Sequence, residues 1–106
     1  MPTVQETFAA MGSRFRPDKA SGTNATIQYD VSGDGGGTWN AVIKDGSCKV
    51  TPGPASNPNL TLSIAAQDWL DMLAGKLSGQ VAFMSGRLRH KGDMSLLMRL
   101  PGLFGV

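Results

Sequence analysis

The chain has 106 residues, of which 41% are hydrophobic and 17% are charged, and its formal net charge at pH 7 is +2. This length accommodates one domain with one core, and the hydrophobic content excludes a disordered chain. So small a net charge does not indicate nucleic-acid binding, and no apolar run reaches the about 20 residues that cross a bilayer. The one cysteine, Cys48, excludes an internal disulfide and a multi-cysteine metal site. We therefore expect a single domain over residues 1–106, and a cytoplasmic location because no signal segment opens the chain.

A helix is predicted near residues 4–15. Thr3 and Glu6 have the spacing of a capping box, in which each side chain accepts a hydrogen bond from the other residue's backbone amide at a helix N-terminus. Apolar residues then recur at helical spacing: Val4, Phe8, Met11 and Phe15. The helix is expected to end before Pro17.

Four segments then alternate apolar and polar residues, which predicts strands with one buried face and one wet face. These segments are 24–31, 39–44, 48–51 and 60–64. Asp45-Gly46 is a two-residue hairpin signal between the second and third segments, and the glycine-rich stretch 33–37 is a looser hairpin loop between the first and second. Prolines between residues 52 and 58 indicate a longer connection to the fourth strand. This pattern is typical of an antiparallel sheet.

The pattern then becomes helical. One helix is predicted with Asp68 in its first turn and Gly75 at its end. Its apolar stripe consists of Trp69, Leu70, Met72 and Leu73. Ser78 is placed to cap a second, shorter helix, which Gly86 closes and which carries Val81, Phe83 and Met84.

A short fifth strand is predicted over residues 87–91. Its basic side chains, Arg87, Arg89 and Lys91, would lie on the wet side, while His90 would share the other side with Leu88. Strands followed by helices, with one sheet face to cover, give the fold class α+β: a five-stranded, mainly antiparallel sheet covered on one face by helices.

The final helix is expected to be capped by Asp93 and ended by Pro101. Between Met94 and Leu100 only Ser95 and Arg99 are polar, so this helix is apolar nearly all round. A surface helix of a small domain normally has one apolar stripe and one wet face. Apolar surface on more than one face therefore needs a second body to bury against: a partner protein, a membrane or a bound apolar molecule.

No residue pattern predicts catalysis. His90 is the single histidine, and no feature links it to the single thiol, Cys48, as a nucleophile and base would require. Asp68 and Asp71 share a helix face, where a structural role is favoured. The stretch 33–37 lacks the lysine and hydroxyl residue of a P-loop. We expect no catalytic residue, no metal and no cofactor. A small hydrolase or acyltransferase stays as an alternative, which would be supported by turnover of a generic ester that survives repurification and is lost in His90→Ala.

Two stretches carry a family resemblance that covers nearly the whole chain. The downstream stretch contains Gly75-Lys76-Leu77, Ala82-Phe83-Met84, Gly86, Leu88, Gly92-Asp93-Met94 and the run 97–100; the upstream one contains Trp39, Asp45-Gly46 and Asn59-Leu60-Thr61-Leu62. With these residues the chain resembles the lipid-binding domain of the sterol carrier protein type 2 (SCP-2) family, as a stand-alone single-domain member. The resemblance implies a sandwich of a five-stranded sheet and helices that holds a long-chain apolar molecule in an internal tunnel.

The resemblance implies that this tunnel lies between the sheet and the C-terminal helices. Nine residues are expected to bind the ligand: Trp39, Ile43, Phe83, Met84, Leu97, Met98, Leu100, Leu103 and Phe104. The expected function is non-catalytic binding and carriage of a fatty acid, acyl-CoA, phospholipid or sterol. Four methionines in the helical region, at 72, 84, 94 and 98, either fill a loose core or form a wall that adapts to several ligands.

Two further partner assignments stay open at the level of the sequence. Arg87, Arg89 and Lys91 either form a solvated face or make transient contact with an anionic membrane surface. We expect a monomer or weak dimer that does not bind nucleic acid. The alternative function is an interaction or dimerisation module accessory to an enzyme, with the apolar C-terminal helix and the tail Leu100–Val106 as its interface.

Overall fold

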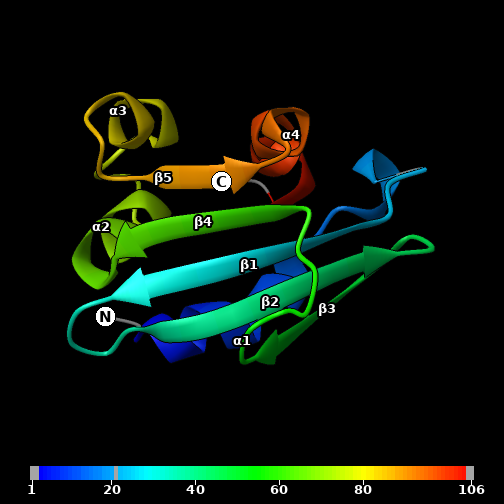
Figure 1. Ribbon diagram of the computed structural model, residues 1–106, viewed down its shortest axis with the longest axis horizontal. Helices are drawn as coiled ribbons and strands as arrows, with labels where there is room; N and C mark the ends of the chain where they lie inside the picture. Colours follow the sequence, from blue (N-terminus) through cyan, green and yellow to red (C-terminus); the bar gives the residue numbers. More distant parts are fainter. Residues whose placement is uncertain (1–2, 21, 105–106) are drawn as a thin grey trace.

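The computed structural model of the protein describes residues 3–20 and 22–104 (Figure 1). A five-stranded sheet forms one layer, and helices packed on one face of the sheet form the other. In chain order the elements are α1 (Val4–Arg14), a 3-10 helix η1 (Pro17–Lys19), β1 (Ala25–Ser32), β2 (Gly37–Lys44), β3 (Ser47–Pro52), β4 (Leu60–Ala65), α2 (Ala66–Leu73), α3 (Gly79–Met84), β5 (Arg89–Gly92) and α4 (Met94–Phe104). The predicted α+β class is confirmed.

The N-terminal helix α1 begins as its sequence predicts. The backbone N–H of Thr3 donates to Oε1 of Glu6 at 2.9 Å, and the backbone N–H of Glu6 donates to Oγ1 of Thr3 at 3.1 Å, so the capping box is present. The apolar stripe of the helix buries Val4, Phe8 and Met11 against the sheet side of the molecule. The cap fixes where the helix starts, and the stripe fixes which face it buries.

The strand order of the sheet is β3-β2-β1-β4-β5. Strands β1, β2 and β3 form an antiparallel meander, and Asp45-Gly46 joins β2 to β3 in a tight turn in which both residues have positive φ, 52° and 76°. The chain then crosses the sheet so that β4 pairs with β1 in parallel, with Tyr29 opposite Leu62, and β5 pairs antiparallel with β4. The sheet is therefore mixed but mostly antiparallel. The alternation pattern did not predict the parallel pairing of β1 with β4.

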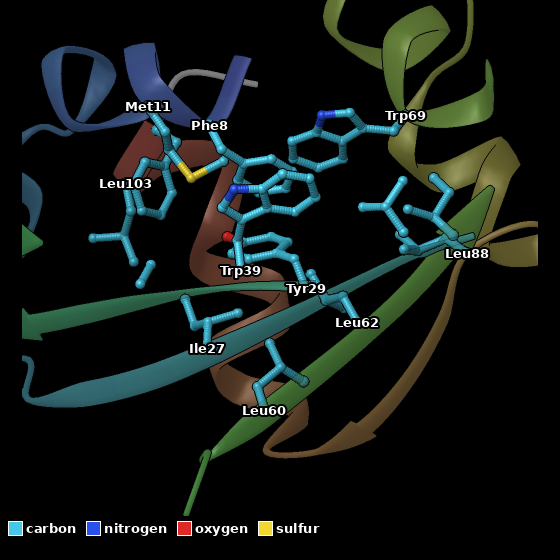
Figure 2. Close-up of a cluster of buried hydrophobic side chains, with 14 of the residues drawn as sticks. Phe8, Met11, Ile27, Tyr29, Trp39, Leu60, Leu62, Trp69, Leu88 and Leu103 are labelled. Carbon is cyan, nitrogen blue, oxygen red and sulfur yellow. The ribbon is translucent and has the colours of Figure 1, made fainter. Parts of the chain in front are cut away.

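One face of the sheet is buried under the helices. The other, which we call the open face, is crossed by the connection 53–59, where Asn40 Nδ2 donates to the carbonyl of Gly53 and the backbone N–H of Ala55 donates to Oε1 of Gln28. On β1 and β2 the buried positions alternate with half-buried or exposed ones, as expected for strands covered on a single face. An aromatic stack lies between the buried face and the helices (Figure 2): the centroid of the Phe8 ring lies 4.4 Å from that of Trp39 and 4.8 Å from that of Trp69, and its plane is nearly parallel to both. The indole Nε1 of Trp69 donates to Oγ1 of Thr7 at 2.8 Å, which joins α2 to α1.

The region after β4 follows the predicted order of helix, helix, strand and helix. Ser78 caps α3, since its Oγ accepts from the backbone N–H of Val81 at 3.1 Å. Asp93 caps α4 by accepting from the backbone N–H groups of Ser95 and Leu96. Strand β5 is shorter and later than predicted, Arg89–Gly92 rather than 87–91, because it must pair with the stretch of β4 between Leu60 and Ser63.

The expectation that Pro101 ends the last helix is wrong, because α4 continues to Phe104. Beyond the proline, the side chains of Leu103 and Phe104 are both buried in the core. The ring of Phe104 lies 5.7 Å from that of Phe15, and the carbonyl of Leu103 accepts from the backbone N–H of Arg16 at 2.8 Å. This burial outweighs the one helical hydrogen bond that a proline removes. Within residues 3–20 and 22–104, no helix is long and apolar enough to cross a bilayer.

Candidate functional site

A cavity of about 870 Å³ lies between the covered face of the sheet and the helices. Its floor is the central parallel pair, through Tyr29 on β1 and Leu62 and Ile64 on β4. All four α-helices contribute walls, and Leu88, just before β5, closes one side. This volume lies within the about 300–1,000 Å³ that small-molecule sites occupy.

The walls of the cavity are mainly apolar. Helix α2 contributes Leu70, Met72 and Leu73, and α1 contributes Ala10 and Met11. The placement of α1 and α2 on the cavity was not foreseen, although their apolar stripes are plain in the sequence. A stripe shows that a helix face is buried, but it does not show whether that face meets another side chain or an open space.

Six of the nine predicted site residues line this cavity: Phe83, Met84, Leu97, Met98, Leu100 and Phe104. They come from α3 and α4, as the resemblance implied. That any of them touches a ligand stays a prediction.

The other three predicted site residues, Trp39, Ile43 and Leu103, do not line the cavity; all three are buried in the core. Trp39 is held in the aromatic stack with Phe8. Strand β2 lies on the far side of β1 from β4, so its buried side chains meet α1 and not the open space. The sequence pattern identified the correct face of β2 but not its distance from the cavity.

Met84 and Met98 mark an opening of the cavity. They line it, and yet 76% of Met84 and 74% of Met98 is exposed. Phe83 also lines the cavity and is exposed, and its ring lies 5.3 Å from the imidazole of His90 on β5. The wall formed by α3 and α4 is therefore in contact with solvent as well as with the cavity.

Few polar groups face the cavity: Glu6, Thr7 and Arg14 from α1, Tyr29 from β1 and Gln80 from α3. Thr7 Oγ1 accepts from Trp69 and donates to the carbonyl of Val4, so its one proton is already engaged. Burial raises the pKa of the Tyr29 phenol well above its usual value, which keeps the hydroxyl protonated at neutral pH. Hydrogen bonds from the backbone and side chain of Thr3 lower the pKa of Glu6, so this carboxylate at the cavity edge stays ionised.

Two kinds of reactive site bear on catalysis by the described residues: a metal centre and a nucleophilic thiol. The described residues include no group of three or more histidine, cysteine, aspartate or glutamate side chains that could hold a metal ion. Cys48 lies on β3, away from the cavity lining, and burial raises the pKa of its thiol to about 11. A thiol with so high a pKa is a poor nucleophile at neutral pH.

Comparison with known proteins identifies the family. The family model of the SCP-2 sterol transfer family matches residues 8–105. The chain belongs to this family. Among curated relatives, this SCP-2 domain is 36% identical over 101 residues to hydroxysteroid dehydrogenase-like protein 2 of Rattus norvegicus; the match covers 94% of the chain but only 19% of the rat protein.

Two solved structures share this fold but differ in how much of their own length the match covers. Palmitated SCP2L2 of Aedes aegypti matches with a TM-score of 0.74 at 19% identity, over 93% of this chain and 91% of that one. The inverting sec-alkylsulfatase Pisa1 of Pseudomonas sp. matches with a TM-score of 0.82 at 21% identity, over 97% of this chain but 16% of that one. Both likenesses establish the fold alone. The family and its neighbours support a lipid-binding or lipid-transfer domain.

Proposed function

We propose that the protein binds a long-chain apolar lipid (a fatty acid, acyl-CoA, phospholipid or sterol) in the cavity and carries it without chemical change. The observation that carries this proposal is the cavity itself: about 870 Å³ of space with walls that are mainly apolar, on the covered face of the sheet. Unfilled apolar space of this size is costly in a protein core, because its lining lacks packing partners. A bound alkyl chain supplies them.

The driving force would be the removal of alkyl surface from water. Each buried methylene contributes about 0.8 kcal/mol, so about 14 buried methylenes give roughly 11 kcal/mol before ordering costs. Low-micromolar affinity, about −8 kcal/mol, is a reasonable remainder. No catalytic residue is required, and we propose that the domain is not an enzyme.

The residues proposed to contact the alkyl chain are the six predicted ones that line the cavity, joined by Leu70 and Leu73 of α2. Met84 and Met98 contribute unbranched, polarizable side chains to the same wall. Such side chains repack easily, which favours binding of several chain types over recognition of a single headgroup.

Two measurements test the proposal. Mass spectrometry of lipids extracted from natively purified protein should show bound long-chain species at a defined stoichiometry. Displacement of a fluorescent fatty acid from delipidated protein should give affinities that improve with chain length between eight and eighteen carbons. Affinity that is flat over this range, or absent, would contradict the proposal.

A second candidate function is that of an interaction or dimerisation module accessory to an enzyme, the alternative that the sequence analysis left open. The supporting observation is that the chain spans about a fifth of the rat relative and 16% of the alkylsulfatase, so similar domains occur inside much longer proteins. The tail proposed as its interface runs to Val106, and residues 105–106 lie outside the described part of the chain. Sedimentation analysis of purified protein separates the two candidates: a monomer with extractable lipid favours the carrier, and a lipid-free dimer favours the module.

A further inference from the structure

Five large apolar side chains are exposed on α3 and α4: Val81, Phe83, Met84, Met94 and Met98. Their exposed fractions run from 39% to 76%. We call this set the apolar rim. Figure 1 shows α3 and α4 beside β5 at one edge of the molecule, and three members of the rim line the same cavity. Exposed apolar residues scattered singly are ordinary, but a group of them marks an interaction surface.

The edge strand between these helices is basic. Arg89 lies opposite Ser63 and Lys91 opposite Thr61, so both basic side chains project from the open face of the sheet, while His90 turns toward Phe83. Arg87, in the bend before β5, is exposed as well. In residues 75–100 the one acidic residue is Asp93, and its carboxylate is engaged in capping α4.

We propose that the α3–β5–α4 edge docks on an anionic lipid bilayer. The apolar rim would enter the headgroup region while Arg87, Arg89 and Lys91 meet the lipid phosphates and carboxylates. This combination selects a bilayer over a protein partner, because the charges are of one sign and a weak apolar anchor becomes effective when a basic cluster accompanies it. The proposal rests on the lipid-carrier function and adds to it the surface through which lipid enters and leaves.

The position of the cavity opening makes this docking useful. Met84 and Met98 belong to the rim and to the cavity wall, so a bilayer in contact with the rim is also in contact with the opening. An alkyl chain could then pass between bilayer and cavity while its methylenes stay covered. Transfer through water would instead expose each methylene at a cost of about fourfold in rate, the equivalent of its transfer free energy of about 0.8 kcal/mol.

The electrostatic half of the proposal is tested by flotation with vesicles of phosphatidylcholine alone or with phosphatidylserine added. The double variant Arg89→Glu/Lys91→Glu reverses two charges at this edge. Its matched control, Lys44→Glu/Lys49→Glu, makes the same change in net charge at the opposite edge, where both lysines are exposed on β2 and β3. Each basic residue at an anionic surface changes partitioning about fivefold, so the first variant should lose at least about 25-fold in binding and the control little.

The apolar half is tested by a second matched pair. Val81 on α3 is exposed and does not line the cavity, and Val42 on β2 is exposed on the open face of the sheet. Val81→Asp should weaken vesicle binding, because it places a charge where the rim enters the headgroups, whereas Val42→Asp should not. Both variants should bind fluorescent fatty acid in vesicle-free solution as the parent does.

These measurements separate the docking surface from the carrier function. Three outcomes would overturn the docking proposal. The two charge variants could lose vesicle binding equally, the parent could bind vesicles of phosphatidylcholine alone as strongly as those with phosphatidylserine, or the parent could bind neither. Concentration-dependent dimerisation that Val81→Asp abolishes, without vesicle binding, would assign the rim to a second copy of the chain. Normal vesicle binding without fatty-acid binding would leave the docking surface standing and refute the carrier function.

Discussion

Two neighbouring residues of α4 provide a direct test of where the cavity begins. Leu96 is 4% exposed and belongs to the core, whereas Leu97 is half-buried and lines the cavity. Leu97→Trp should extend a ring into space that a ligand would occupy. If the ring displaces about three methylenes at about 0.8 kcal/mol each, the Kd for chains of sixteen to eighteen carbons should rise about sixtyfold. Chains of eight carbons should be affected much less, because they leave part of the cavity empty.

The same substitution should cost the ligand-free fold little. In a closely packed core a larger side chain costs about 1–3 kcal/mol, but beside an open space it can be accommodated. Truncation gives the opposite comparison: Leu96→Ala should lose about 2–5 kcal/mol of unfolding free energy, and Leu97→Ala clearly less. The assay is urea unfolding of the delipidated variants, run beside displacement of a fluorescent fatty acid over a series of chain lengths.

One combination of results would refute this reasoning. If Leu97→Trp and Leu97→Ala both destabilise the protein as much as Leu96→Ala does, Leu97 is packed core. If, in addition, long-chain affinity is unchanged, α4 does not form a wall of the binding site. The accessory-module candidate would then become the better reading.

Three further predictions follow from contacts in the fold. Thr7→Val should cost about 1–3 kcal/mol by leaving the indole N–H of Trp69 without its acceptor, and urea unfolding of a Trp69→Phe background should show that cost largely removed. Gly92→Ala should lower the free energy of unfolding by at least about 1–3 kcal/mol, because φ there is 112° and a Cβ would clash with the backbone carbonyl of Asn59. Gly12→Ala in α1, where a Cβ would meet no other atom, should raise it by about 0.5–1 kcal/mol. Burial raises the folded-state pKa of Cys48 from 9.0 to about 11, so the thiol of the unfolded chain ionises first as the pH rises. The free energy of unfolding should therefore fall between about pH 9 and 11. Urea unfolding between pH 8 and 11 should show a smaller fall in Cys48→Ala than in the parent.

Local signals made the elements of this fold predictable. The capping box at Thr3, the hairpin at Asp45-Gly46 and the caps at Ser78 and Asp93 each involve residues that are close in the chain. Their hydrogen bonds form within one turn, so the sequence specifies them almost completely. The helix end expected at Pro101 failed for the opposite reason, because burial of distant partners against Leu103 and Phe104 decided it.

The cavity was predictable only in part. Apolar character all round α4 showed that its residues need more than one surface to bury against, and Phe83, Leu97 and Leu100 do line the cavity. Alternation along β2 showed that Trp39 and Ile43 lie on the covered face of the sheet. It could not show that they lie in the packed part of that face and not beside the cavity, because alternation does not give the place of a strand in the strand order. That place depends on the crossover that pairs β4 with β1.

The parallel pairing of β1 with β4 also has a consequence for the order of folding. Ile27 pairs with Leu60 across a long intervening segment, whereas the β1–β2–β3 meander closes through two short turns. Contacts between residues distant in sequence form late, because the entropy of closing the loop is lost before the contact is gained. The meander should therefore fold first, and β4, β5 and the helices around the cavity should assemble on it. Amide hydrogen exchange should then be faster in these later elements than in the meander, which would make the lipid-holding part of the domain the part that opens most readily without unfolding the rest.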